Sequence, residues 1–289
     1  MLILGLAAFA GAVGVAVATA VRKWPARDPS APRLSGPEIR ATVARHPHLR
    51  ARLRSRLDPA IATELAVSSA FLIFVAAATL IGILAAMART NSGLAHYDVR
   101  VASWAARHHT TTATSVFRFA SRFGGAVYIV PLAFVVATVE SLRLRSRSVW
   151  AFLLLVVGGQ FLLANTVKYF VDRARPSLDQ LTGFSGTSFP SGHATATAAT
   201  YAAFALLIGI NRSRVIKQVG AGAAATVAIF IGGTRVLLGV HWLTDVVAGL
   251  LLGWSWFAIC SFAFGGRFLR FGLPVEIAAQ AAEPQHAPD

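Results

Sequence analysis

The amino-acid sequence predicts an all-α fold, a polytopic bundle of membrane helices. Of its 289 residues, 55% are hydrophobic and only 13% are charged, a composition too apolar for an ordinary soluble domain. Several stretches of about 20 apolar residues are present, and each is long enough to cross about 30 Å of hydrocarbon. These runs are too long for strands and lack the alternation of strands, so they indicate helices.

Seven spans are expected in chain order, at residues 2–21, 65–88, 124–141, 149–170, 192–210, 218–238 and 243–264. The third contains Pro131, which membrane helices tolerate when neighbouring groups satisfy the freed carbonyl. The first is expected to stay as an uncleaved transmembrane helix over residues 1–21, because no basic residue precedes its apolar run. Its small residues Ala16, Ala18 and Ala20 leave a cleaved signal peptide as the alternative.

The segments outside the spans divide the rest of the chain into three regions. Residues 22–60 hold six prolines and ten basic residues, and we expect a basic cytoplasmic linker attracted to anionic lipid head groups. Residues 61–270 are expected to form a six-helix membrane domain, in which residues 95–122 lie as amphipathic helix on the outer face. Residues 271–289 are expected to form a mobile cytoplasmic tail.

The basic residues predict how the bundle is oriented. With residues 22–60 in the cytoplasm, 18 of the 27 Lys and Arg residues fall on the cytoplasmic side, as the positive-inside rule requires. The same distribution argues against a nucleic-acid partner despite the net charge of +15, because the cations lie in short loops between apolar runs. The sequence therefore predicts a multi-pass protein of the cell (inner or plasma) membrane.

Three polar clusters interrupt the apolar second half of the chain. They are Lys168–Pro176 (KYFVDRARP), Pro190–His193 (PSGH) and Thr234–Asp245 (TRVLLGVHWLTD). Charges near a bilayer core cost about 2.5–3.5 kcal/mol each, so membrane segments keep them mainly for function. In the topology derived from charge, all three clusters fall at extracytoplasmic helix ends, and their three cations, two imidazoles, hydroxyl and carboxylate suit a phosphate group.

The second cluster is suited to binding an anion at the start of a helix. Pro190 precedes a helix that is expected to begin near Ser191, and unpaired N–H groups at a helix N-terminus bind phosphate oxygens. Gly192 lets the backbone approach the anion closely, and His193 in the first turn can face the bound group. The alternative is a serine-capped helix with an interfacial histidine.

The first cluster offers two kinds of cation. Lys168 and Arg175 are seven residues apart, which is two helical turns, so they would share a face if the helix persisted. Lysine is a compact point charge, and arginine offers a planar fork to phosphoryl oxygens. The alternative is a pair of snorkelling cations at a helix end. Arg173 fits that alternative better and is expected to face lipid head groups.

The third cluster combines a histidine with a carboxylate. His241 and Asp245 are four residues apart, so on a helix they share a face. A carboxylate that accepts from one imidazole nitrogen fixes the tautomer and leaves the other nitrogen as base or nucleophile. Arg235 lies six residues earlier, and Gly239 allows the turn between them. The alternative is a His–Asp pair that only caps the last helix.

Together the clusters resemble the signatures of the type 2 phosphatidic acid phosphatase superfamily, the lipid phosphate phosphatases, which read K-x6-R-P, P-S-G-H and S-R-x5-H-x3-D. Lys168, Arg175 and Pro176 match the first signature. Residues 190–193 match the second in full. Arg235, His241 and Asp245 match the third, with Thr234 in place of the serine. The resemblance covers about residues 65–264 and implies a six-helix phosphatase core, to which the first span adds one extra N-terminal helix.

The resemblance implies a metal-independent integral membrane phosphatase that hydrolyses a lipid phosphate or polyprenyl diphosphate on the extracytoplasmic side. His241 would attack phosphorus and form a phosphohistidine. Asp245 would orient it, and His193 would protonate the leaving oxygen and then activate water. The phosphoryl oxygens would be held by Lys168, Arg175, Arg235, Ser191 and the N–H of Gly192. No cofactor or metal is expected, because the three cations supply the charge and the pair His108–His109 has no carboxylate or cysteine nearby.

Two other functions stay open from the sequence: a phosphotransferase of the same fold, and a non-catalytic phospholipid-binding or transport protein. The resemblance does not choose among undecaprenyl- or decaprenyl-type diphosphates, phosphatidylglycerol phosphate and phosphatidic acid as substrates. Head-group selectivity would come from residues 95–122 and loop 177–189. Four aromatic residues either line an acyl or prenyl access path or anchor the protein at the membrane interface: Tyr169, Phe184, Phe189 and Trp242. The oligomeric state is not predicted.

Overall fold

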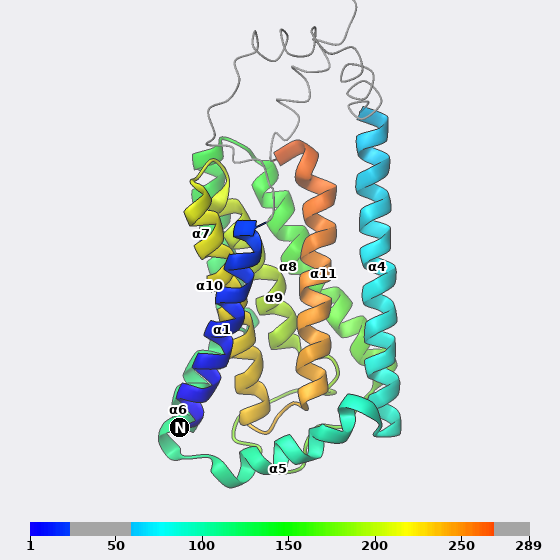
Figure 1. Cartoon of the computed structure of the whole chain (residues 1–289), viewed down its shortest axis with the longest axis vertical. Coiled ribbons are helices and arrows are strands. Elements are labelled where there is room, and N and C mark those ends of the chain that lie inside the picture. Colours follow the sequence, from blue (N-terminus) through cyan, green and yellow to red (C-terminus); the bar gives the residue numbers. More distant parts are fainter. Residues whose placement is uncertain (24–58, 269–289) are drawn as a thin grey trace, which may run out of the picture.

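The structure is a computed structural model, and it describes residues 1–23 and 59–268 as a bundle of helices without strands (Figure 1). The predicted cytoplasmic tail and nearly all of the predicted basic linker lie outside these residues. The described elements are α1 (Leu2–Lys23), α4 (Pro59–Thr90), the short 3-10 helix η1 (Gly93–Tyr97), α5 (Asp98–His108), α6 (Thr111–Arg122), α7 (Ala126–Leu144), α8 (Ser148–Val171), α9 (Gly192–Gly209), α10 (Arg214–Leu237) and α11 (Leu243–Phe268).

Six of the described helices are long and apolar enough to cross a membrane, namely α1, α4, α7, α8, α10 and α11. The predicted span at residues 192–210 is also helical, as α9, but it is not among these six. Helix α9 is rich in small Ala and Thr residues, and its packing explains this composition. It packs against α7, α8, α10 and α11, and residues 194–200 are all buried. Small Ala and Thr side chains suit a helix that other helices cover.

Close helix contacts bring the starts of α9 and α11 together. A Cβ on Gly249 of α11 would lie 2.6 Å from the carbonyl oxygen of Ser191, and one on Gly253 would lie 2.4 Å from that of Thr195. Only glycine permits backbones to approach so closely at these points. The backbone N–H of Ser191 then donates to the carbonyl of Asp245 at 2.9 Å. The second and third polar clusters are therefore held against each other.

The extra N-terminal helix α1 packs along α10. A Cβ on Gly14 would lie 2.0 Å from Oγ1 of Thr226 and 2.7 Å from the carbonyl oxygen of Gly222, so the two helices are in intimate contact. The first residues of α1 lie at the same end of the bundle as α6 (Figure 1). There they pack against a buried cluster that includes Phe117, Leu238 and Val240. Helix α1 therefore reaches the loop that precedes His241.

The segment predicted to be amphipathic helix, residues 95–122, forms η1, α5 and α6. In Figure 1, α5 runs across the end of the bundle at which α8 and α10 end and α9 and α11 begin. One face of this segment is buried, through Asp98, Ala102, Ala105, Ala113 and Phe117. The two short helices are therefore part of the packed structure at the end that carries the polar clusters.

Candidate active site

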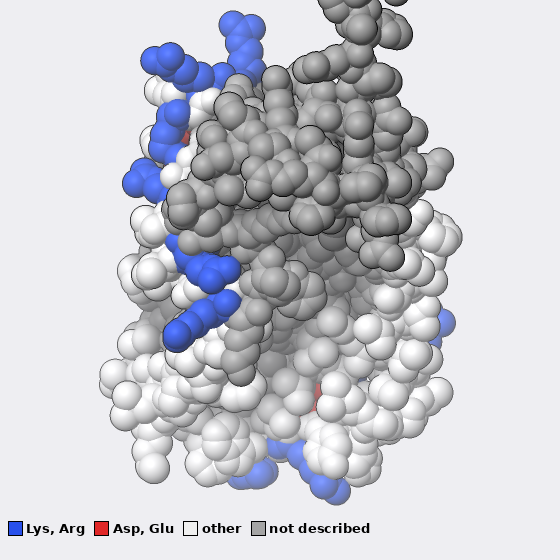
Figure 2. Space-filling view, turned by 45° about the horizontal axis from the view of Figure 1, so that its top comes forward, with Lys and Arg blue, Asp and Glu red and all other residues white. Residues whose placement is uncertain are grey.

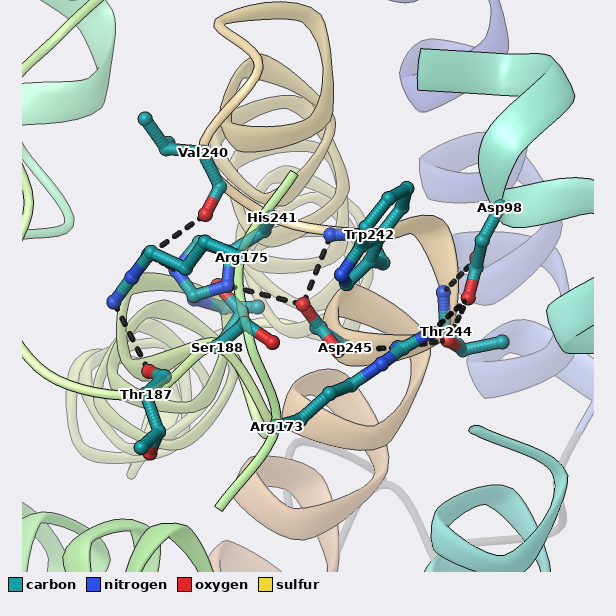
Figure 3. A network of polar contacts seen from close by, with 12 residues as sticks. Asp98, Arg173, Arg175, Thr187, Ser188, Val240, His241, Trp242, Thr244 and Asp245 are labelled. Carbon is teal, nitrogen blue, oxygen red and sulfur yellow. Dashed lines mark hydrogen bonds and ion pairs between the residues drawn. The ribbon is translucent and has the colours of Figure 1, made fainter. Parts of the chain in front are cut away.

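The three polar clusters converge at this end of the bundle, although they span 78 positions of the chain. Figure 3 shows side chains of the first and third clusters in contact. Lys168 comes from the last turn of α8, His193 from the first turn of α9, and Arg235 from the last turn of α10. Arg175 and His241 come from loops, and Asp245 from the start of α11. His193 interacts electrostatically with Lys168, Arg175, Arg235 and His241, so the predicted residues form one site.

Asp245 contacts His241 by reaching back across the start of α11. One carboxylate oxygen, Oδ2, accepts from the backbone N–H of Trp242 at 2.9 Å and lies 3.4 Å from Nδ1 of His241. A carboxylate in the first helical turn that accepts the N–H of the capping residue is a common helix-start arrangement. The contact between His241 and Asp245 is present as predicted, but it is not made on a shared helical face, because His241 precedes the helix.

The contacts of His241 define its tautomer. Its Nε2 lies 3.1 Å from NH1 of Arg175, and arginine can only donate a hydrogen bond. We therefore assign Nε2 as the acceptor and place the proton on Nδ1, facing Asp245 (Figure 3). Burial lowers the pKa of His241 to about 4, against the opposing effect of Asp245. The imidazole is thus neutral at pH 7, with a lone pair on the nitrogen that faces the cations.

Lys168 and Arg175 meet at a carbonyl rather than on a helix face. Helix α8 ends at Val171, and Asp172 takes up a left-handed conformation with φ of 45°. The helix does not persist to Arg175, so the condition under which the two cations would share a helical face is not met. The loop instead brings the carbonyl of Thr187 to both, at 2.6 Å from Nζ of Lys168 and 3.1 Å from NH2 of Arg175.

Every N–H group of Arg175 has a contact. Nε donates to Gly186 and NH2 to Ser185, both at backbone carbonyls, and NH1 donates to the carbonyl of Val240 at 2.7 Å. The guanidinium also lies over the ring of Phe184, at 4.8 Å from its centroid. Arg175 thereby joins loop 184–187 to the loop that carries His241.

The start of α9 is built as its sequence predicts. Ser191 is the capping residue, and its Oγ accepts from the N–H of Ala194 at 3.5 Å. The ring of His193 packs against a turn between α6 and α7 that carries no sequence motif. A Cβ on Gly124 would lie 3.1 Å from Cδ2 of His193, and one on Gly125 would lie 3.6 Å from its Nε2. This glycine pair makes room for the histidine.

Arg235 is buried, with 4% of its surface exposed. Its NH1 donates to Oγ of Ser121 on α6 at 2.6 Å. Its Nε is buried and has no hydrogen-bond partner among the described residues, so it remains a donor for a bound oxygen. The neighbouring Thr234 bonds through its hydroxyl to the carbonyl of Ile231 in its own helix, at 2.6 Å.

The sequence predicted that Arg173 faces lipid head groups, and this prediction is wrong. The side chain points into the site. Its NH1 donates to Oδ1 of Asp245 and to Oγ1 of Thr244, and its NH2 donates to Oδ2 of Asp98, each at 2.7 Å (Figure 3). The left-handed turn at Asp172 precedes it, and the chain reverses there. Asp98 is 1% exposed and was missed, although acidic residues are scarce enough, 12 in the chain, for each to be informative.

The structure separates the four aromatic residues. Phe189 is wholly buried in a cluster with Ile81, Leu84 and Ala248, so both roles predicted for it are wrong. Tyr169 is 81% exposed and Phe184 is 48% exposed. Trp242 lies under the guanidinium of Arg173, 5.3 Å from its ring centroid, and its Nε1 donates to the carbonyl of Ala174. It therefore supports the loop at the site.

The described residues contain no group of three or more His, Cys, Asp or Glu that could hold a metal ion. The two neighbouring histidines at the end of α5 each use Nδ1 to contact a backbone carbonyl of their own turn. His108 contacts Trp104 and His109 contacts Ala106, both at 2.8 Å. Lys168, Arg175 and Arg235 are cations that lie around His193 in the site.

Comparison with known proteins agrees with this arrangement. The family model described as PAP2 superfamily matches residues 148–268. A lipid A 1-phosphatase of Rhizobium etli is 42% identical over 119 residues, covering 38% of this chain and 47% of that protein. Phosphatidylglycerophosphatase B of Bacillus subtilis is 30% identical over 140 residues, covering 46% of this chain and 66% of that protein.

A second lipid A 1-phosphatase, from Rhizobium johnstonii, is 39% identical over 138 residues, covering 44% of this chain and 51% of that protein. The chain thus spans about half the length of the two lipid A 1-phosphatases that it matches. The crystal structure of a transmembrane PAP2-type phosphatidylglycerolphosphate phosphatase from Bacillus subtilis matches with a TM-score of 0.62 and 27% identity, over 68% of this chain and 98% of that one. Sequence, fold and site agree, and residues 148–268 of this chain form a domain that matches the PAP2 superfamily.

Proposed function

We propose that this protein is an integral membrane phosphatase that hydrolyses a lipid phosphate through a phosphohistidine intermediate at His241. One observation carries the proposal: a buried, neutral imidazole holds its proton toward Asp245 and turns its lone pair toward Arg175. Such a ring is a nucleophile at neutral pH. The names of the relatives, lipid A 1-phosphatase and phosphatidylglycerophosphatase B, both state a phosphatase activity on a lipid.

In the first half of the reaction, Nε2 of His241 attacks phosphorus and a P–N bond forms. The P–O bond to the lipid breaks, and His193, which takes up a proton when the anionic phosphate binds among the cations, gives that proton to the leaving oxygen. The imidazole becomes positively charged, and the carboxylate of Asp245 beside Nδ1 compensates that charge. General-acid help of this kind typically contributes about 10²–10⁴-fold.

In the second half, water attacks the phosphorus of the phosphohistidine. Neutral His193 takes a proton from that water, the P–N bond breaks, and its electron pair returns to Nε2. Inorganic phosphate leaves, and both histidines regain their starting protonation states. The same pair of imidazoles thus serves both halves, with His193 as acid and then as base.

The cations around His241 hold the phosphoryl oxygens. Nε of Arg235 is a buried donor without a partner in the described protein. NH1 of Arg175 exchanges its contact with Nε2 of His241 for a phosphoryl oxygen, which frees the lone pair. The N–H of Gly192 and the hydroxyl of Ser191 lie at the start of α9, where anions bind well. Phosphoryl transfer relies mainly on such positioning and charge compensation.

We place this chemistry on the extracytoplasmic side of the membrane. The turns at the other end of the bundle carry six basic residues, Arg143, Arg145, Arg147, Arg212, Arg214 and Lys217. Figure 2 turns that end forward and has Lys and Arg side chains gathered along one side of it. Basic residues in short loops mark the cytoplasmic side, which supports an outward-facing site.

Cysteine labelling in intact cells tests this orientation. In a variant that lacks Cys260, a cysteine at Gly183, in the loop between α8 and α9, is expected to react with a membrane-impermeant maleimide. A cysteine at Arg212 in the α9–α10 turn is expected to react only after the cells are broken. The opposite pattern would place the site in the cytoplasm.

The function itself is tested with protein purified in detergent. The protein is expected to release inorganic phosphate from at least one member of a panel of lipid A 1-phosphate, phosphatidylglycerol phosphate, phosphatidic acid and a polyprenyl diphosphate. Rapid quenching with labelled substrate should trap an acid-labile phosphoenzyme whose label maps to His241. Label that moves to another acceptor would identify a phosphotransferase, and binding without release would identify a non-catalytic lipid-binding protein.

A further inference from the structure

We propose that Arg173 and Asp98 are positioning residues, which hold the carboxylate of Asp245 in the orientation that its contact with His241 requires. The inference rests on the proposed function, because it takes His241 as the nucleophile. Neither residue has a hydrogen bond or ion pair with His241 among the contacts of the described residues, and the ion pair of Arg173 with Asp245 provides the link.

The first step is the way the carboxylate of Asp245 is shared. Its Oδ2 serves His241 and the N–H of Trp242, while its Oδ1 accepts from NH1 of Arg173 at 2.7 Å. Among the described residues, Arg173 is the only side chain that bonds to Oδ1. Because both oxygens are engaged, the carboxylate is restrained from rotating, and Oδ2 stays beside Nδ1 of the imidazole.

The second step concerns charge. The side chain of Asp245 is fully buried, and that of Arg173 is 14% exposed. A buried carboxylate that loses its charged partner is strongly disfavoured. Arg173 therefore stabilises Asp245 as an anion, which is the form that can accept from Nδ1 and compensate a phosphohistidine.

The third step is the way Asp98 fixes the arginine. Asp98 begins α5, and its Oδ2 accepts from NH2 of Arg173 at 2.7 Å while its Oδ1 accepts from the backbone N–H of Thr244 at 3.0 Å. The hydroxyl of Thr244 donates its one proton to Asp98 and accepts from NH1 of Arg173. Asp98 thus orients the guanidinium of Arg173 and links α5 to the first turn of α11.

A double-mutant cycle measures whether Arg173 acts through Asp245. Arg173→Met is expected to lower kcat by about 10–100-fold, the loss typical when an outer partner that orients a ligand histidine is removed, with a far smaller change in KM. Arg173→Lys should recover part of the loss, because an ammonium reaches one carboxylate without the fork.

In the Asp245→Asn background, the same Arg173→Met change should cost less than about threefold, because coupled residues are not additive. Single-turnover measurements at high enzyme concentration keep the residual rate measurable. Full additivity of the two losses would overturn the inference, since a residue with a general structural role weakens both backgrounds equally.

A second readout needs no substrate. Nitrogen-15 NMR of histidine-labelled protein reports which ring nitrogen of His241 carries the proton. We expect the Nδ1–H form in the wild type, with a proton signal shifted downfield by the carboxylate of Asp245, and a loss of that downfield shift in Arg173→Met. An unchanged Nδ1–H proton shift in that variant would overturn the inference. A wild type that releases phosphate from no lipid would contradict the proposed function, while this spectrum would still judge the positioning role.

Matched variants separate positioning from folding. Arg89 is another arginine that donates a hydrogen bond at this end of the bundle. Its acceptor is the backbone carbonyl of Phe170 at 2.9 Å, and it has no hydrogen bond with Asp245. Arg89→Met should therefore keep near-wild-type kcat. Asp98→Asn keeps an oxygen for the N–H of Thr244 and should lose less activity than Arg173→Met. Detergent unfolding curves identify any misfolded variant, and if Arg173→Met misfolds, Arg173→Lys and Asp98→Asn complete the cycle.

Discussion

Two regions of the molecule meet at the site, and they differ in how much of their role is visible in the sequence. Residues 148–268 match the family model and hold every residue predicted to do chemistry. Residues 93–125, which form η1, α5, α6 and the turn after them, carry no motif. Yet Asp98 contacts Arg173, Ser121 contacts Arg235, and Gly124 packs against His193.

The difference has a physical basis. A group that reacts with phosphate must have a particular chemistry, so its residue type and spacing are constrained. A group that supports it needs only to offer a donor, an acceptor or free space at one point. Residues 93–125 provide two acceptors, the carboxylate of Asp98 and the hydroxyl of Ser121, and free space at the missing side chain of Gly124. Such support becomes visible only when the fold brings it to the site.

The largest effect is expected within the region that carries the motifs. His241→Ala removes the proposed nucleophile, and turnover should fall by at least about 10³-fold, as removal of a catalytic nucleophile does elsewhere. The trapped phosphoenzyme should disappear at the same time. Phosphate release and phosphoenzyme formation measure the two effects. Activity near that of the wild type would reject His241 as the nucleophile.

A smaller but clear effect is expected from the region without motifs. Gly124→Ala places a methyl group 2.7 Å from Cγ2 of Ile231 and 3.1 Å from Cδ2 of His193, so Ile231 must shift and the histidine ring must move slightly. Misplacement of a catalytic group by about 1 Å can cost about 10²-fold, and for this smaller displacement we expect kcat to fall by about tenfold.

Gly158→Ala on α8 is the control for Gly124→Ala, since a Cβ there would meet nothing within 4 Å. Its activity should match the wild type in the same phosphate-release assay. Equal activities of the two variants would mean that residues 93–125 cover the site without shaping it. The claim that this region supports the reactive groups would then be wrong.

The sequence predicted the fold and the reactive groups because both depend on local patterns. Apolar runs of membrane length predicted the helices, and α9 at Gly192–Gly209 lies within the predicted residues 192–210. The motif spacing predicted the set of residues that includes His193, Arg235 and His241, and these converge in the structure. Their exact roles in catalysis remain predictions.

What the sequence could not predict depends on how the chain turns between helices. Arg173 points inward because Asp172 adopts a left-handed conformation and ends α8, and nothing in the pattern KYFVDRARP shows this turn. Phe189 is buried because α4 and α11 pack around it. Both residues lie close to a helix end in the sequence, where residues that face the membrane interface are common. Only the tertiary packing decides the environment of each.

A still smaller effect tests α1, which lies outside the family match. Gly14→Leu would force a side chain into Thr226 and the backbone of Gly222, and such overpacking typically costs about 1–3 kcal/mol. We expect a lower unfolding temperature in detergent. Because the first residues of α1 pack with Leu238 and Val240 beside His241, we also expect a loss of activity of about two- to fivefold.

Gly11→Leu is the matched control on the same helix, because a Cβ at Gly11 meets nothing within 4 Å. It should unfold and react like the wild type. If Gly14→Leu changed stability but left phosphate release untouched, α1 would stabilise the bundle without supporting the loop that carries His241.

The smallest expected effect concerns the source of positive charge. Lys168, Arg175 and Arg235 already converge on the two histidines, so we expect compensation of the phosphoryl charge to need no divalent ion. Purified protein dialysed against a chelator should keep its rate of phosphate release within about twofold, a change of less than about 0.5 kcal/mol in activation free energy. A loss restored by added Mg²⁺ or Zn²⁺ would show that side chains do not supply the whole charge. Residues 148–268 would then depend on a metal ion that their motifs do not indicate. Part of the role of both regions would in that case be invisible in the sequence.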